Sequence, residues 1–316
     1  MSSEINARIA GARGFIFDMD GTIALGDAAS GGHKALPGAV EFLALLRKRG
    51  TPFRVFTNGT AKPPAAYAAS LRNAGLDLAD HEMMTPSSSA AIWFEKQGIK
   101  RVRVLGNAGV AAPLIERGID VVGASEPGDV DAVYTGWFRE FTFPDLEAAC
   151  ESVWNGAMLA TASHVPFFAT ATGRGIGSSF AINKMIAAMT GKQAKVLGKP
   201  SRIAFDAAVA AMELPRSAAK DIVVFGDDPA LEMRMARGAG AVGAERDLNP
   251  EATGESDAET AFAEPERAEV EPNVGRWREE RLKEGPQPGP AEPSAPSAPP
   301  RLSARTRSSQ RPQLQL

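Results

Sequence analysis

Two aspartates, Asp18 and Asp20, follow the short apolar run 15–17 with one residue between them. Side chains two positions apart on an extended chain point the same way, so both carboxylates should face one site. Adjacent carboxylates repel each other, and a hard cation with oxygen ligands, such as Mg²⁺, relieves that repulsion. Such a cation keeps positions open for water and a substrate phosphate. One carboxylate can then attack the phosphate while the other transfers the proton. The alternative is a solvated turn, because Asp20 and Gly21 form a common turn pair.

Two clusters further along the chain carry groups that suit a phosphate. Thr57, Asn58 and Gly59 offer a hydroxyl, an amide and backbone N–H groups, although Asn-Gly is also an ordinary turn. Lys199 is followed by Pro200, which would open the next helix and hold the lysine rigidly. A fixed ammonium neutralises phosphate charge and stabilises the charge that develops during phosphoryl transfer. Taken alone, a lysine in a loop can equally be a solvated side chain that binds no ligand.

A fourth cluster, Asp227 and Asp228, follows the apolar run 222–225 closely. Acidic residues at the end of a strand and before a helix suit a metal site. Asp228 precedes Pro229, and this pair is a strong signal for the start of a helix. We therefore assign Asp228 to the helix cap and Asp227 to the metal.

The segments around these clusters alternate between strand and helix patterns. The run 222–225 is typical of a strand in a buried parallel sheet, and 203–212 has apolar residues at helical spacing. This alternation predicts an α/β fold, in which ligands bind beyond the carboxyl ends of the strands, where the clusters lie. The expected strands are 15–17, 53–56, 102–105, 121–122, 132–134, 158–160 and 222–225, and the expected helices include 37–49, 64–74 and 203–212.

In this order the clusters resemble the four motifs of the haloacid-dehalogenase-like hydrolase superfamily. The sequences DMDGT, TN, GKPS and GDD with a later Glu are similar to motifs one to four, and the resemblance covers about 14–243. The stretch between TN and GKPS resembles the α/β cap of the subfamily that includes p-nitrophenylphosphatases and phosphoglycolate and pyridoxal-phosphate phosphatases. The resemblance implies a Rossmann-like parallel-sheet core with an inserted α/β cap. The expected parts are the core, 1–82 and 191–244, the cap, 83–190, and a disordered tail, 245–316.

The resemblance also implies a role for each motif residue. It makes Asp18 the nucleophile and Asp20 the general acid and base of a magnesium-dependent phosphatase that hydrolyses small phosphomonoesters through an aspartyl-phosphate. Asp18, the Asp20 backbone carbonyl and Asp227 would hold Mg²⁺. Glu232 matches a position where relatives have an outer-shell Asp. The residues implied for binding the transferring phosphoryl group are Thr57, Asn58 and Lys199.

Two other functions remain open: a phosphotransferase or mutase on the same fold, and a non-catalytic protein that binds a phosphate ligand. Segment 160–166 lacks the Asn-Pro-Asp of some relatives, so the resemblance names no substrate. Similar proteins add a strand and a helix after the fourth motif, whereas here 241–243 leads into the tail, so we expect the closing edge of the sheet to be missing or replaced. The glycine-rich segment 173–177 either contacts the substrate or is a flexible loop that leads into a helix near Ile182, and we expect the loop. Of the three histidines, we place only His164 near the site.

Composition limits the remaining classes of function. The formal net charge of −3 gives no electrostatic case for binding nucleic acid or an anionic membrane. No apolar stretch approaches the roughly 20 residues of a membrane span, and the N-terminus has no signal-peptide pattern. We expect a cytoplasmic protein whose partner is a small phosphorylated metabolite, with a homo-oligomer left open. Beyond Glu245 the chain is rich in Pro, Ser, Arg and Glu, which predicts disorder.

Overall fold

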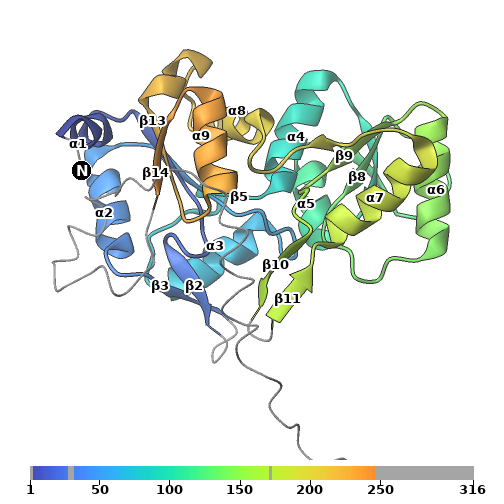
Figure 1. Cartoon of the computed structure of the whole chain (residues 1–316), viewed down its shortest axis with the longest axis horizontal. Helices are drawn as coiled ribbons and strands as arrows, with labels where there is room; N and C mark the ends of the chain where they lie inside the picture. Colours follow the sequence, from blue (N-terminus) through green and yellow to red (C-terminus); the bar gives the residue numbers. More distant parts are fainter. Residues whose placement is uncertain (1–2, 28–31, 171–172, 246–316) are drawn as a thin grey trace, which may run out of the picture. The chain divides into compact units, whose positions relative to one another are not determined.

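The computed structural model describes residues 3–27, 32–170 and 173–245, and Figure 1 labels most of their helices and strands. These residues form two five-stranded sheets and two two-stranded hairpins. The α/β class expected from the sequence is confirmed. The predicted disorder of 245–316 concerns residues that, apart from Glu245, lie outside the described part. Within the described part, no helix is long and apolar enough to cross a membrane.

The first sheet has the strand order β14-β13-β1-β4-β5, and every pairing in it is parallel. Its three central strands are buried along their whole length. A parallel strand with both faces covered is largely apolar, which explains the sequences FIF and IVVF; β4 is the exception, because it contains the buried Arg54. The strands are β1 (Gly14–Phe17), β4 (Phe53–Phe56), β5 (Met83–Met84), β13 (Ile222–Gly226) and β14 (Val242–Glu245).

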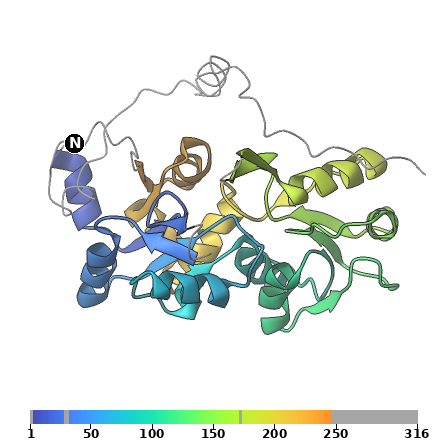
Figure 2. The ribbon, with the colours of Figure 1, turned by 90° about the horizontal axis from the view of Figure 1, so that it is seen from below.

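Helices cover both faces of this sheet, as Figure 2 shows. Successive side chains of a strand point to opposite faces. Phe15 and Phe17 of β1 therefore share a cluster with Leu43 of α2, while Ile16 between them shares one with Phe205 of α8. The helices on the first face are α2 (Ala39–Arg49) and α3 (Pro64–Asn73), and those on the second are α8 (Arg202–Ala211) and α9 (Arg234–Ala239).

The second sheet has the order β12-β9-β8-β6-β7, again with parallel pairings. Helices α4 and α5 pack on one face and α6 and α7 on the other. Its strands are β6 (Arg101–Leu105), β7 (Asp120–Val122), β8 (Ala132–Thr135), β9 (Met158–Thr161) and β12 (Lys195–Val196). Its helices are α4 (Pro86–Gln97), α5 (Ala108–Glu116), α6 (Phe143–Trp154) and α7 (Ser178–Thr190). The remaining helical segments are α1 (Ser3–Ala10) and the short turns η1 (Asp80–Glu82), η2 (Arg216–Asp221) and η3 (Pro229–Met233).

The strand pairings can be compared with the limits expected for the core, 1–82 and 191–244, and for the cap, 83–190. Strand β5 pairs with β4 in the first sheet, and β12 pairs with β9 in the second. A division by sheet therefore falls after Met84 and after Val196, a few residues beyond the limits expected from the sequence.

The expectation that the first sheet lacks its closing strand is wrong. Strand β14 pairs with β13, with Val223 opposite Val242 and Phe225 opposite Ala244. Val242 and Ala244 are buried, whereas Glu245 is exposed. This alternation is that of an edge strand with one covered face.

Two hairpins were also not expected. They are β2 (Ala24–Asp27) with β3 (Gly32–Ala35), and β10 (Phe167–Thr170) with β11 (Gly173–Ile176), and both are antiparallel. The expectation of a flexible loop at 173–177 is therefore wrong. Strand β11 begins at Gly173 with a φ of +135°, a conformation that glycine adopts without strain. These strands are hard to predict from the sequence because each is only four residues long, and β2, β3 and β11 contain glycine.

Candidate active site

The strands of the first sheet bring three of the sequence clusters to one edge. Phe17 at the end of β1 lies opposite Phe225 of β13, and β4 flanks β1 on its other side. The strands are parallel, so Asp18, Thr57 and Asp227 all lie at their carboxyl ends. The Asp18 backbone N–H donates to the Phe225 carbonyl at 2.9 Å. Asp18 itself is buried.

Lys199 supplies the buried cation of this edge. Its side chain is 1% exposed; Nζ contacts Asp18 Oδ1 and lies 2.6 Å from Glu232 Oε1. The Phe56 ring centroid is 5.9 Å from the same nitrogen. Burial acts to lower the pKa of Lys199, but the charges and hydrogen bonds of the two carboxylates outweigh it and raise that pKa above its ordinary value. Lys199 is therefore a charged ammonium held in contact with Asp18.

Glu232 is the partner that the sequence placed only in an outer position. It lies in η3, a turn of π-helix, a feature common near functional sites. Gly226 makes room for it, because a Cβ at Gly226 would lie 2.2 Å from Glu232 Cγ. Removing one member of a buried ion pair costs about 3–5 kcal/mol, because it leaves the other charge unpaired. Glu232 thus stabilises the buried Lys199 ammonium beside Asp18.

Asn58 holds the backbone of Lys199. Its Nδ2 donates to the Lys199 carbonyl at 3.0 Å, and its Oδ1 accepts from the Lys199 N–H at 2.9 Å. Gly198 permits this approach, because a Cβ there would lie 2.7 Å from Asn58 Oδ1 and 2.3 Å from the Ala162 carbonyl. One N–H of the Asn58 amide remains for a ligand. Thr57 Oγ1 accepts from the backbone N–H two residues on, at 3.1 Å, and keeps its hydroxyl proton.

Asp227 approaches the turn after β1 at Gly21, the residue next to Asp20. Gly21 has a φ of +83°, and a Cβ there would lie 2.1 Å from Asp227 Oδ2. Only glycine therefore lets the Asp227 carboxylate approach this turn. The Gly21 N–H donates to the Ala24 carbonyl at 2.9 Å and closes the turn. The Asp20 side chain is 56% exposed and therefore accessible to solvent.

Burial and mutual repulsion act on the carboxyl groups of this edge. Burial raises the pKa of Asp18 to about 6; Lys199 lowers it, and the charges of Asp227 and Asp20 raise it further. Burial and the charge of Glu232 likewise raise the pKa of Asp227 to about 6. The edge therefore carries more negative charge than the single ammonium of Lys199 balances.

The donor atoms at this edge fit Mg²⁺. The side chains of Asp18 and Asp227 and the Asp20 backbone carbonyl offer only oxygen ligands, which this hard cation prefers. The described residues contain no cluster of three or more His, Cys, Asp and Glu side chains arranged for a metal. The expected site does not need one, because it uses two side chains and a backbone carbonyl, and Mg²⁺ usually keeps several waters. The close approach of Asp227 at Gly21 supports this fit.

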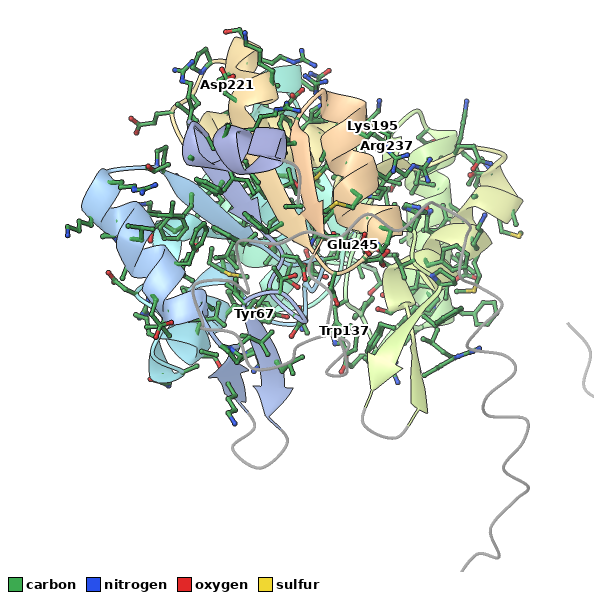
Figure 3. The ribbon with its side chains drawn as sticks, turned by 60° about the vertical axis from the view of Figure 1, so that its left-hand side comes forward. Tyr67, Trp137, Lys195, Asp221, Arg237 and Glu245 are labelled. Carbon is green, nitrogen blue, oxygen red and sulfur yellow. The ribbon has the colours of Figure 1, made fainter. Side chains whose placement is uncertain are left out.

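His33 lies next to Asp20, although we did not single it out from the sequence. Its side chain is 9% exposed, and its Nε2 is 3.9 Å from Asp20 Oδ1. On the other side of the ring, Nδ1 is 2.8 Å from Ser70 Oγ. The ring centroid lies 6.5 Å from that of Tyr67, which Figure 3 labels close to the β2–β3 hairpin. Burial, and then the charge of Lys62, lower the pKa of His33 and favour its neutral form.

The family model described as haloacid dehalogenase-like hydrolase matches residues 15–120, the segment that contains the first two clusters. Together with the four clusters in their expected order, this match confirms the resemblance to the haloacid dehalogenase-like hydrolases. Among the chain's relatives is the acid sugar phosphatase of Staphylococcus saprophyticus, 26% identical over 216 residues, which are 68% of this hydrolase and 78% of that protein.

Other relatives of the hydrolase are similar over most of their length. The 5'-nucleotidase YutF of Bacillus subtilis is 24% identical over 229 residues, covering 72% of this hydrolase and 84% of that protein. The solved structure of the p-nitrophenyl phosphatase from Archaeoglobus fulgidus superposes with a TM-score of 0.65 at 22% identity. That match covers 74% of this hydrolase and 85% of the other chain, so the two share a fold.

Proposed function

We propose that this hydrolase is a magnesium-dependent phosphatase that acts on small phosphomonoesters through an aspartyl-phosphate on Asp18. The chain is a phosphoric monoester hydrolase. The observation that carries the mechanism is the buried Lys199 ammonium in contact with Asp18, at an edge that also holds Asp227. A nucleophile, a fixed cation and a second carboxylate at one edge suit phosphoryl transfer, which depends mainly on positioning and charge stabilisation.

In the first step, an Asp18 oxygen attacks phosphorus in line. A bond forms between that oxygen and phosphorus while the bond from phosphorus to the leaving alcohol breaks, and Asp20 protonates the alcohol oxygen. In the second step, Asp20 takes a proton from water as the water oxygen attacks phosphorus. The bond between phosphorus and Asp18 then breaks, which releases phosphate and restores both carboxyl groups.

The other residues at this edge bind and orient the phosphoryl group. Lys199 stabilises negative charge on the phosphoryl oxygens, and the Thr57 hydroxyl and the free N–H of Asn58 donate to them. Mg²⁺ held by Asp18, Asp227 and the Asp20 backbone carbonyl would add positive charge beside the same oxygens.

The substrate is proposed as a small phosphorylated metabolite that the second, inserted sheet unit selects. The similar proteins are named for different substrates, a sugar phosphate and a nucleotide among them. We expect release of free phosphate from p-nitrophenyl phosphate and from some members of a panel of sugar phosphates and nucleoside monophosphates with Mg²⁺. No release from any of them would contradict the proposed hydrolysis. Transfer of the phosphoryl group to a sugar acceptor instead would favour the phosphotransferase or mutase.

His33 is proposed to position Asp20, which leads to a further prediction. Because Asp20 protonates the leaving group, His33→Ala should lower kcat about 10-fold for an alkyl phosphate, a part of what a general acid contributes. The loss should be much smaller for p-nitrophenyl phosphate, whose leaving group needs no proton. Ser70→Ala, which removes the hydroxyl beside His33 Nδ1, should act in the same direction. The exposed His81 provides the control, His81→Ala. Equal losses on both substrates would point to general damage rather than positioning.

A further inference from the structure

Helices α4 and α8 pack against each other and border a cleft of about 500 Å³. None of the residues proposed above for catalysis, phosphate binding or metal binding lines it. Its volume lies within the range of small-molecule sites, which is roughly 300–1,000 Å³. A ligand in this cleft would therefore be distinct from the substrate of the proposed reaction.

The inner part of the cleft is apolar and has an aromatic wall. Ile92 and Val209 line it and are buried, and Leu214 completes this surface. Trp93 lies beside them and is only partly buried. The Nζ of Lys195, labelled in Figure 3, is 5.5 Å from the centroid of the Trp93 ring. An aromatic wall of this kind offers a stacking surface to a planar ring.

The polar part of the cleft has an excess of positive charge. Lys96, Arg202 and Arg216 line it, and Asp206 is the one acidic side chain among its lining residues. Asp206 pairs with both arginines: Arg202 Nε is 2.7 Å from its Oδ1, and Arg216 Nη2 is 2.8 Å from its Oδ2. Three cations and one carboxylate leave a net charge of +2. Arg216 is 70% exposed and keeps donors for an anion, because a guanidinium has five N–H groups.

We propose that this cleft is a second ligand site, which binds a small planar aromatic anion. The ring stacks on Trp93 above the apolar surface, and the anionic group accepts hydrogen bonds from Arg216 and pairs with Lys96. The apolar part of the cleft recognises the ring of the ligand, and the cationic part recognises its anionic group. The apolar surface alone would not select a charged ligand, and the cations alone would not select an aromatic one.

The test uses the full chain, with naphthalene-2-sulfonate as the probe because the proposed phosphatase cannot hydrolyse it. Binding is followed by isothermal titration calorimetry and by fluorine NMR of 5-fluorotryptophan-labelled protein, with the Trp93 signal assigned from Trp93→Leu. We expect saturable binding that shifts the Trp93 signal. Neutral 2-naphthol and non-aromatic cyclohexanesulfonate should both bind much more weakly. Binding should persist in the Asp18→Asn variant and in saturating orthovanadate, whether or not the proposed phosphatase activity is found.

Variants separate this site from adventitious binding. Arg216→Gln should weaken the probe about 10-fold, through loss of a charge-assisted hydrogen bond, and Trp93→Leu about 5-fold, through loss of stacking. The matched control is Arg117→Gln, which removes an exposed arginine that pairs with Glu95 outside the cleft and should leave the affinity unchanged. Unchanged affinity in Arg216→Gln, equal binding of cyclohexanesulfonate, or competition by orthovanadate would overturn the proposal.

Discussion

Asp18→Asn should lower kcat for p-nitrophenyl phosphate by about 10⁶-fold, the scale of loss when an enzyme loses its nucleophile. Asparagine keeps the size of the side chain but removes the charged oxygen that attacks phosphorus. Lys199 stays paired with Glu232 at 2.6 Å, so the fold should survive the substitution. Turnover is measured by release of p-nitrophenol, and the fold by circular dichroism and Tm.

Asp228→Asn is the matched control for this variant. Asp228 lies near the same edge and caps η3, where its Oδ1 accepts from the Ala230 N–H at 2.7 Å. Asparagine caps a helix about as well as aspartate, so both stability and turnover should stay near wild type. Near-wild-type turnover of Asp18→Asn, in protein that is folded, would rule out Asp18 as the nucleophile.

Removal of divalent cations should abolish phosphatase activity, and Mg²⁺ should restore it. The reason is the unbalanced negative charge of Asp18 and Asp227, each of which has a pKa raised to about 6. Ca²⁺ should restore activity poorly, because it accepts longer and less regular coordination than Mg²⁺. The measurement is phosphate release after EDTA treatment and dialysis, followed by titration with each cation.

A binding measurement separates loss of the metal from loss of catalysis. Calorimetry should show weaker Mg²⁺ binding in Asp227→Asn than in wild type. Because a raised pKa means that the carboxyl group holds its proton up to a higher pH, protons compete with Mg²⁺ below about pH 6, where the apparent affinity should fall. Asp221→Asn serves as the control, because Asp221 ends η2 at the amino end of β13, opposite to the carboxyl end that holds the site. Full activity in metal-free buffer would contradict the proposed site.

Local patterns in the chain were enough to predict the fold class and the family. The runs 15–17 and 222–225 are apolar throughout, as is typical of strands buried on both faces, and each was recognisable without its partner. The helix cap at Asp228 was also predicted, because a cap depends on residues only two or three positions away. The order of the clusters at the strand ends then identified the family. The roles of Asp18, Asp20 and the other motif residues stay a prediction.

The pairing of the side chains at the site depends on the tertiary structure and could not be predicted from the sequence. Lys199 and Asp18 are 181 positions apart in the chain, yet they are in contact. Glu232 against Lys199 and His33 against Asp20 are likewise pairs between different elements. Such contacts depend on which strands are neighbours and on how the helices pack over them. Neither the strand order nor the helix packing produces a recognisable pattern in the residues next to these side chains. Strand β14 and the β10–β11 hairpin were not predicted for the same reason: each strand is only four residues long and is held in place by its partner strand.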